Sequence, residues 1–510
     1  MMDAPKLNPQ DTLKESYPKL NQSIDNANEA LNRVTNAENN SAEAKEIAEQ
    51  TQTELRQAVL EGDSSPLTGV LSVGADGTVY EDGPQQRLVA EHNKVTVDLA
   101  TKVVIEDFNQ YKEITKEELD LINTIKFINR ENGGYSWWVY PNVYRPLTEV
   151  YDKTYLSFVN KSMQTIIASL DNDTGKYESF SLQTDDVADE HNSAAITLHR
   201  QSGRLMVAYT KHNSESKIYV RISTDPESIT DFNEPVVLTT KSTATYAQLI
   251  YLSGKYHLFY RTGFSWQYRN STDGTTWSSE KEIVLAASQY YLRIVPHYNT
   301  IRIIFIGHPI LSDDHNIRYG RINTDTGVID TLGGITLGNI DGTNLPIVST
   351  SYGKVYDGDE SGKRARLFDV SYVNDFNEQG TGFAFAEFTN ETDCVYKVAK
   401  SVGGSFKFST VCSGGLPLEE PAGQNYYFGG SWFEFNNDKI IYVARESGGT
   451  WYVEKYQTTD YTTWTLVEQI ETSRKLKLHR PCVPYGGGKL FYTKGTYRFY
   501  TDYDTKVISQ

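Results

Sequence analysis

The chain has 510 residues, enough for two or three folding units and a sizeable core. Its formal net charge is −17 and it carries no basic stripe, so it lacks the electrostatic footprint of a nucleic-acid binder. Three cysteines exclude a disulfide framework and a paired C-x-x-C zinc site. No apolar run approaches the roughly 18 residues of a membrane span, and residues 1–30 show no signal-peptide core. We therefore expect a chain made soluble in the cytoplasm, which acts outside only after lysis or export by a machine.

Residues 1–62 predict a helical coiled-coil stalk. The first part of its seam follows alternating steps of four and three residues: Leu13, Tyr17, Leu20, Ile24, Ala27, Leu31 and Val34. After one extra step of three, the seam continues through Ala37, Ser41, Ala44, Ala48, Thr51, Leu55 and Ala58. A period of about 3.5 residues is typical of supercoiled helices, and the extra step is a stammer that overwinds them locally. A single amphipathic helix packed on a globular domain is the alternative.

Residues 63–130 predict a small β-rich connector that contains a turn at 75–77 and one short helix at 116–128. From about residue 131 to residue 510 the pattern changes, and short apolar runs alternate with turn residues. Aromatic residues make up 12% of the chain, which is typical of β-sheets and also suits stacking on sugars.

One unit recurs through residues 131–510: an apolar run, a turn and a second apolar run. Tyr246–Arg261 and His479–Lys494 are two well-matched copies. Similar units begin near Val143, His191, Tyr291, Asn344 and Gly429. Seven units at a spacing of roughly 45–55 residues predict a mainly β fold, a seven-bladed β-propeller. A two-sheet sandwich is the alternative, although it requires no such regularity.

Sharp turns follow several of these units. Ser271–Trp277 and Thr458–Trp464 share one spacing, and Asp171–Gly175 and Asn323–Gly327 share another. The side-chain oxygen of such a turn accepts hydrogen bonds from backbone N–H groups two or three residues further on. The first two turns resemble the Asp-box of BNR-repeat propellers, which occur in sialidases and many carbohydrate-active proteins, although each is one residue shorter. We expect these turns to be structural, and they do not imply sialidase activity.

Polar residues at the ends of neighbouring hairpins are expected to converge at one mouth of the propeller channel. In a hairpin, the start of the first strand and the end of the second lie at the same end of the sheet. The flanking pairs are His191 with His212, Tyr246 with Arg261, and Tyr291 with His308.

The first two pairs suit β-elimination from a uronic acid. Arg261 would clamp and neutralise the carboxylate, so that the neighbouring proton becomes acidic. A histidine is the natural base near neutral pH, and Tyr246 would donate a proton to the leaving oxygen. A blade-edge residue with satisfied partners is the alternative for each of them alone.

The stretch Trp137–Trp277 resembles the BNR-repeat propellers of the ulvan-lyase type. The matching segments are Trp138–Pro141, Asp189–Ala195, Gly203–Asn213 and Tyr246–Arg261. By that resemblance, His191 and His212 correspond to the bases, Tyr246 to the acid and Arg261 to the carboxylate neutraliser. The candidates for substrate binding are Asn192, Tyr291, His308 and Trp138.

No metal or cofactor is expected to take part in this chemistry. A structural zinc is known in such lyases, but His479 and Cys482 are too sparse to be assigned as its ligands. BNR propellers with this strand pattern also occur without lyase activity. The enzyme therefore stands beside two alternatives, a non-enzymatic carbohydrate-binding tail adhesin and a free secreted polysaccharide lyase.

Residues 10–95 resemble the attachment region of tail fibre and baseplate proteins from phages of Gram-positive bacteria. The matching segments are Asp11–Gln22, Leu60–Ser65, Val73–Tyr80 and Arg87–Asn93. This resemblance implies a phage or prophage receptor-binding protein of the virion tail. Its partners would be a bacterial cell-surface polysaccharide and, through the N-terminus, other tail or baseplate proteins. Small and β-branched seam residues allow three strands and phage fibres are commonly trimers, so we expect a homotrimer.

Overall fold

The computed structural model describes most of the chain after residue 126. The described ranges are 127–146, 152–375, 378–418, 426–434 and 439–510. The chain divides into two compact units, Met1–Ile122 and Asn123–Gln510, and every described residue belongs to the second. The predicted coiled-coil stalk and most of the predicted connector therefore lie outside the described residues. Strand β1 (Phe127–Gly134) takes up the end of the predicted helix 116–128, so the β domain starts slightly before residue 131.

The described residues form six sheets, in which strands adjacent in sequence usually pair antiparallel. The sheet that holds both ends of the domain contains β28 (Lys477–Cys482), β29 (Phe491–Phe499), β30 (Asp502–Ser509), β1, β3 (Lys153–Asn160), β4 (Gln164–Asp171) and β5 (Tyr177–Thr184), with β2 (Val143–Tyr144) beside β3. The next two sheets contain β6 (Ala195–His199), β7 (Arg204–Tyr209), β8 (Lys217–Pro226) and β9 (Val236–Thr239), then β10 (Ala244–Leu252), β11 (Lys255–Thr262), β12 (Ser265–Ser271) and β13 (Lys281–Val284).

The other three sheets complete the domain. They contain β14 (Tyr290–His297), β15 (Thr300–Gly307), β16 (Ile317–Asn323), β17 (Val328–Asp330), β18 (Thr336–Asn339) and β19 (Gly353–Tyr356); β20 (Arg364–Asp375), β21 (Glu378–Phe388), β22 (Val395–Val402) and β23 (Ser405–Ser413); and β24 (Ser431–Glu434), β25 (Ile440–Ser447), β26 (Thr450–Gln457) and β27 (Thr465–Ser473). The described helices are short: η1 (Glu190–Asn192), η2 (Ser349–Ser351) and α5 (Gly358–Ser361).

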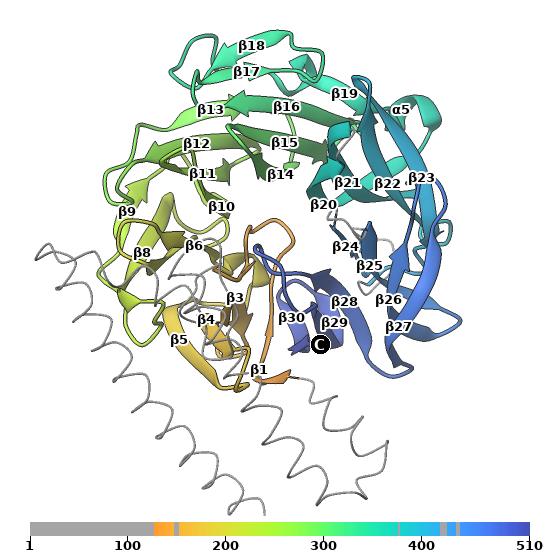
Figure 1. Ribbon diagram of the computed structural model, residues 1–510, viewed down its shortest axis with the longest axis horizontal. Helices are drawn as coiled ribbons and strands as arrows, with labels where there is room; N and C mark the ends of the chain where they lie inside the picture. The colour runs from red at the N-terminus through yellow and green to blue at the C-terminus, as the bar shows by residue number, and fades with distance from the viewer. Residues whose placement is uncertain (1–126, 147–151, 376–377, 419–425, 435–438) are drawn as a thin grey trace, which may run out of the picture. The chain divides into compact units, whose positions relative to one another are not determined.

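The sheets follow one another around a ring. In Figure 1 the first strand of a sheet such as β14–β18 or β20–β23 lies toward the centre, and the last lies at the rim. Radial repetition of small antiparallel sheets is the architecture of a β-propeller. The mainly β, propeller-type fold expected from the repeats is therefore confirmed.

Burial falls from the centre of the ring to its rim. The first seven residues of the inner strand β10 are all buried, whereas the rim strand β27 has no buried residue. Strands covered on both faces read as nearly continuous apolar runs, and β15 accordingly reads Ile-Arg-Ile-Ile-Phe-Ile over residues 301–306. The hydrophobic core thus lies between neighbouring sheets and nearest the axis.

The sharp turns have the structural role expected for them. Asp273 Oδ1 accepts hydrogen bonds from the backbone N–H groups of Thr275 and Thr276 at 2.9 and 2.7 Å. Asp460 Oδ1 accepts from Thr462 and Thr463 at 2.8 and 2.9 Å in the second copy. These bonds close each loop locally, and the turns therefore shape the rim of the sheets rather than a site.

A segment inside the ring, Tyr135–Asn142, ties the sheets together (Figure 1, orange). All of its residues are buried, and three of its carbonyl groups accept hydrogen bonds from side chains of different sheets. Gln248 donates to Trp138 at 3.2 Å, Arg293 to Trp137 at 2.6 Å and Arg480 to Tyr135 at 2.5 Å. We call Tyr135–Asn142 the central segment.

Strand β1 joins the two ends of the domain. It pairs with β30 along one edge and with β3 along the other. Side-chain contacts add to this junction, since Thr505 Oγ1 donates to the Gly133 carbonyl at 2.7 Å.

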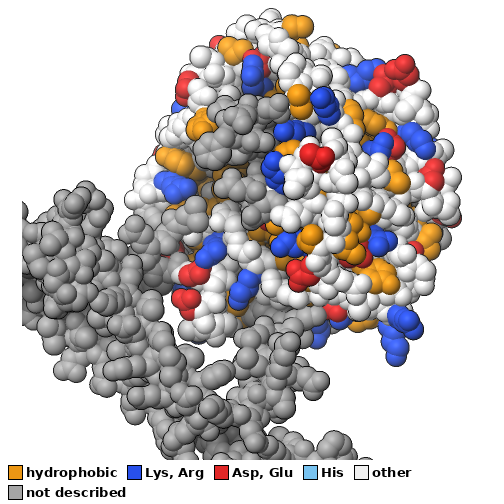
Figure 2. Space-filling model, turned by 45° about the vertical axis from the view of Figure 1, so that its right-hand side comes forward, with side chains coloured by type: hydrophobic (Ala, Val, Ile, Leu, Met, Phe, Trp, Pro, Cys, Tyr) orange, Lys and Arg blue, Asp and Glu red, His pale blue; other side chains and the backbone are white. Residues whose placement is uncertain are grey.

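Two observations concern the described helices and one face of the surface. None of the described helices is long and apolar enough to cross a membrane. On the face shown in Figure 2, acidic and basic side chains are interspersed, without a stripe of one sign. The expectation that the chain binds no nucleic acid stays a prediction.

Candidate active site

The loop before β6 positions the first histidine. Asp189 is the N-cap of η1 and accepts a hydrogen bond from the backbone N–H of His191 at 2.9 Å. The next residue, Glu190, forms a buried bidentate ion pair with Arg480 of β28. The loop is therefore fixed to another sheet by one acidic residue while the other acidic residue is left for the histidines.

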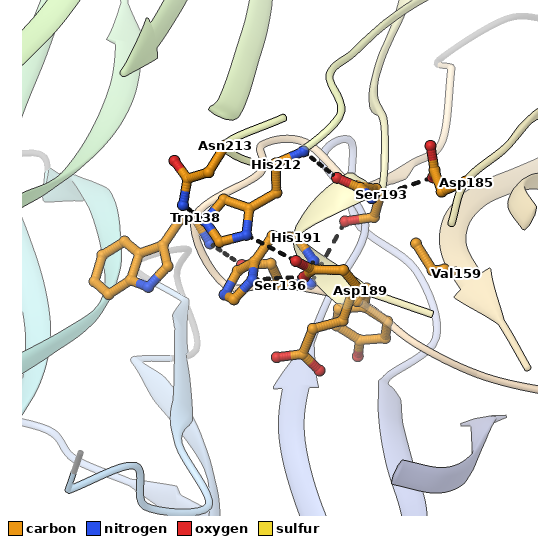
Figure 3. A network of polar contacts seen from close by, with 12 residues as sticks. Ser136, Trp138, Val159, Asp185, Asp189, His191, Ser193, His212 and Asn213 are labelled. Carbon is orange, nitrogen blue, oxygen red and sulfur yellow. Dashed lines mark hydrogen bonds and ion pairs between the residues drawn. The ribbon is translucent and has the colours of Figure 1, made fainter. Parts of the chain in front are cut away.

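Asp189 connects the two predicted bases (Figure 3). Its Oδ1 lies 2.7 Å from Nδ1 of His191, and its Oδ2 lies 2.7 Å from Nδ1 of His212. The two imidazole centroids are 4.4 Å apart. A carboxylate only accepts hydrogen bonds, so each ring donates its Nδ1–H and carries its lone pair on Nε2.

The pKa shifts of Asp189 and His191 favour a charged carboxylate beside a neutral imidazole, as a general base requires. Burial raises the pKa of Asp189, but His191 and His212 outweigh it through charge and hydrogen bonds, and the pKa lies well below its usual range. Burial lowers the pKa of His191, while Asp189 partly opposes this effect. His191 is therefore neutral at neutral pH, and its Nε2 is a proton acceptor.

The two histidines differ in what surrounds Nε2. The amide Nδ2 of Asn213 donates to Nε2 of His212 at 2.8 Å. Within the described part of the chain, Nε2 of His191 has no such donor. His191 is thus the histidine whose lone pair is ready to take a proton, and His212 supports it across Asp189.

Tyr246 reaches the histidines from a bulge at the start of β10. Its φ of 58° is in the left-handed region, and the strand register shifts between Thr245 and Gln248. A bulky residue held there costs on the order of 1–3 kcal/mol, and such strain collects at functional sites. The ring centroid of Tyr246 lies 5.2 Å from that of His191 and 5.6 Å from that of His212.

The phenol of Tyr246 stays protonated. Burial and the neighbouring Tyr291 raise its pKa well above the usual range, although Arg261 acts in the opposite direction. A phenol in this state donates a hydrogen bond and can act as an acid.

Arg261, on β11, lies over the Tyr246 ring, with its guanidinium carbon 4.6 Å from the ring centroid. The side chain is buried, and its Nε and Nη1 form no hydrogen bond with any described residue. A buried cation without an acceptor is unfavourable, because its lost hydration is not replaced. The position is therefore suited to an anion.

Two of the four predicted substrate-binding residues serve as framework. Asn192 is buried, accepts from the backbone N–H of His212 at 2.5 Å and donates to Asp185 at 3.1 Å. Trp138 of the central segment is buried and stacks on Tyr291, with centroids 4.5 Å apart. Their expected contact with substrate stays a prediction.

The other two, Tyr291 and His308, extend the group beyond Arg261. Their ring centroids are 5.7 Å apart, and Tyr291 lies 5.8 Å from Tyr246. The backbone N–H groups of Ile310 and Leu311 donate to Nδ1 of His308 at 3.1 Å. Burial, aided by nearby Arg366 and Arg261, lowers the pKa of His308 to about 3, so it is neutral and presents Nε2–H as a donor.

The structure brings the predicted catalytic residues together and adds some that the sequence did not single out. Asp189 lies two residues before His191, inside the matched segment, and a carboxylate beside a candidate base was an available signal. Tyr500 lies 4.7 Å from His191, centroid to centroid, but comes from the other end of the chain and carries no local signal.

The same group is the place where the described residues could hold a metal ion. Asp189, His191 and His212 each offer a ligand atom, and these atoms lie within 4.8 Å of one another. Both carboxylate oxygens of Asp189 already accept from the histidines. A metal here would use the Nε2 atoms or replace those hydrogen bonds.

The comparisons with known proteins agree with this fold. The BNR repeat-containing family matches residues 153–407, half of the chain. A PL25 ulvan lyase bound to -[GlcA(1-4)Rha3S]- aligns with a TM-score of 0.58 at 14% identity, over 74% of this chain and 93% of that one. Another structure of a PL25 ulvan lyase aligns with a TM-score of 0.57 at 14% identity, over 74% and 94%. No curated protein matches the sequence. At this identity the likeness to the lyases shows the fold.

Proposed function

The chain belongs to the BNR repeat-containing family, and on that premise we propose that its propeller binds a bacterial surface polysaccharide that contains uronic acid and cleaves it by β-elimination. The observation that carries this proposal is the Asp189 bridge between two histidines, with a protonated tyrosine and an unpaired buried arginine beside them. The fold shared with ulvan lyases supports it.

In the proposed reaction Arg261 binds the uronate carboxylate and stabilises the charge that develops when the neighbouring C–H bond breaks. Nε2 of His191 accepts that proton, and Asp189 stabilises the imidazolium that forms. The electron pair of the C–H bond forms a C=C bond as the bond to the leaving oxygen breaks. Tyr246 donates its proton to that oxygen. The products are an unsaturated uronate end and a free hydroxyl.

The test is to incubate the protein with uronic-acid polymers and to record the ultraviolet absorbance of unsaturated ends. We expect turnover by the wild type and none by Tyr246→Phe, because that change removes one hydroxyl and little contact area. Binding and melting temperature should stay near wild type. Unchanged turnover in a folded Tyr246→Phe protein would contradict the assignment. A wild type that binds but forms no chromophore would favour the adhesin.

We further infer that the domain has seven blades. The eight-stranded sheet then divides into a first blade of β2–β5 and a last blade of β28–β30 completed by β1. The pairing of β1 with β30 supports this division.

We also propose that the protein acts in a phage tail as a homotrimer, joined to other tail proteins through its N-terminal region. The resemblance of residues 10–95 and the seam within 11–60 support this role. Light scattering should give a trimer mass for the full chain and a monomer mass for residues 123–510, a fragment that keeps β1 whole. A monomeric full chain would contradict the proposal.

A further inference from the structure

A second arginine near the candidate site, Arg366 of β20, is buried without a hydrogen-bonding partner among the described residues. No part of its side chain is exposed. None of its three guanidinium nitrogens forms a hydrogen bond with a described residue, and no carboxylate within the described ranges pairs with it. Arg366 carries no local signal in the sequence.

Arg366 and Arg261 lie around the same ring. The guanidinium carbon of Arg366 is 5.0 Å from the Tyr291 centroid, and that of Arg261 is 5.6 Å from it. Both arginines also act on His308, which lies 5.7 Å from Tyr291 between ring centroids. The two cations therefore belong to one cluster, built from β11, β14 and β20.

Other buried arginines of the propeller do have acceptors. Arg480 pairs with Glu190, and Arg293 donates to the Trp137 carbonyl at 2.6 Å. Arg366 instead lies over aromatic faces, at 3.8 Å from the Tyr427 centroid and 5.9 Å from that of Trp138. Aromatic faces attract a cation, but they accept none of the five N–H groups of a guanidinium.

Burying a charged group without acceptors is unfavourable, and an arginine side chain stays charged because it does not lose its proton in proteins. Two such cations in one buried cluster also repel each other. A bound anion removes both penalties, since each carboxylate or sulfate oxygen accepts charge-assisted hydrogen bonds from the planar fork.

We propose that Arg261 and Arg366 form a paired anion site around Tyr291, which binds two acidic groups of one glycan. On the proposed function, Arg261 takes the carboxylate of the uronate that reacts. Arg366 takes an acidic group on an adjoining sugar, a carboxylate, sulfate or phosphate. The substrate is therefore an acidic glycan with a second anion beside the reacting uronate, rather than one in which uronates are spaced by uncharged sugars. Because Arg366 is fully covered, binding requires side chains around it to move.

The direct test uses sulfate as the probe. Melting temperature is measured against sodium sulfate concentration, with sodium chloride keeping the ionic strength constant. Wild type, Arg366→Met and the buried control Arg293→Met are compared. A general effect of sulfate on folding is common to all three, so a difference confined to Arg366→Met reports the site. We expect its half-maximal sulfate concentration to rise by about tenfold or more. Equal sulfate responses in Arg366→Met and wild type would overturn the proposal.

Arg366→Lys is a second test of the site, which applies even if Arg366→Met does not fold. It keeps the charge among the aromatic rings but loses the fork, and its sulfate response should be weakened by severalfold. A response equal to that of wild type would count against the site. The surface variant Arg321→Met, which loses a partly exposed ion pair with Asp330, should respond as wild type does.

A second measurement separates this inference from the proposed function. On a polymer that the wild type cleaves, Arg366→Met should raise KM by about tenfold or more with a smaller change in kcat, because Arg366 holds a group remote from the reacting carbon. If no polymer is cleaved but the sulfate difference persists, the anion site stands and the lyase assignment falls. If cleavage is seen and Arg366→Met matches wild type in both assays, the lyase stands and the paired site falls.

Discussion

Two hairpins of the propeller, β10–β11 and β28–β29, share the same backbone geometry but differ in the partners of their side chains. Each inner strand has a bulge: the register shifts between Thr245 and Gln248 in β10 and between His479 and Cys482 in β28. Each bulge holds a large residue in the left-handed region, Tyr246 with a φ of 58° and Arg480 with a φ of 56°.

The arginines near the two bulges differ in their hydrogen-bond and ion-pair partners. Arg480 has a carboxylate partner in Glu190 and donates to the Tyr135 carbonyl of the central segment. Beside Tyr246, Arg261 has no carboxylate partner among the described residues. The same kind of bulge therefore stabilises the propeller in β28, whereas in β10 it lies beside an arginine that has no ion-pair partner among the described residues. A strained bulge alone does not indicate chemistry, whereas a bulge beside a buried, unpaired cation does.

The largest effect expected from this comparison is the loss of stability in Arg480→Ala. The change leaves Glu190 buried without its cation, and breaking a buried pair from one side typically costs about 3–5 kcal/mol. Urea unfolding should show this loss, while Arg261→Ala, which breaks no pair, should be close to wild type. Equal stability of Arg480→Ala and Arg261→Ala would erase the distinction between the two hairpins.

The next effect is on the rate. Arg261→Ala should lower kcat by about 10²–10³, the range for removing one group that stabilises developing charge. Arg261→Lys should recover little, because lysine lacks the planar fork. Steady-state kinetics on a cleaved polymer measures both. A fall in melting temperature with kcat unchanged would place Arg261 in the structural class of Arg480.

A smaller loss of rate is expected for Asp189→Asn. Asparagine offers one acceptor and one donor, so only one histidine keeps a partner for its Nδ1–H, and kcat should fall on the order of 10- to 100-fold.

The pH profile tests this role of Asp189 directly. The Asp189 charge raises the pKa of His191 against the effect of burial, so its removal should shift the acid limb of the rate profile to lower pH. A reduced rate with an unmoved acid limb would make Asp189 a purely structural residue.

The smallest expected effect is on the pH dependence of stability, and both hairpins contribute to it. Burial lowers the pKa of His257 in β11 to about 4 and that of His479 in β28 well below its usual value. Between pH 4 and about 6.5 the unfolded chain binds these protons and the native chain does not, so stability falls as pH falls. Each histidine should contribute up to about 1.4 kcal/mol per pH unit.

Unfolding free energies measured at pH 7 and pH 5 check this linkage. His257→Gln and His479→Gln should each reduce the difference between the two pH values, and by similar amounts. If neither substitution alters the change in unfolding free energy between pH 7 and pH 5, the buried histidines do not cause that change.

The sequence predicted the propeller because its repeats are local: a hairpin such as Tyr246–Arg261 carries its own turn and its own pattern of apolar residues. It predicted the convergence of His191, His212, Tyr246 and Arg261 for the same reason, since each pair flanks one turn. Arg366 was not foreseen, because the signal is the absence of a partner, and that is a property of packing. The Glu190–Arg480 pair joins residues 290 apart, and no local pattern connects them.

The pairing of β1 with β30 has a consequence for how the chain is made. The contact between Gly133 and Thr505 spans 372 residues, so β1 waits for almost the whole domain to be translated before its partner β30 exists. At bacterial and eukaryotic elongation speeds this delay is roughly 20–75 s. Throughout that time the open edges of the nascent sheets are templates for wrong pairing, including pairing with other nascent chains. Ring closure is therefore a late event of high contact order, and it is the step most exposed to competition from aggregation.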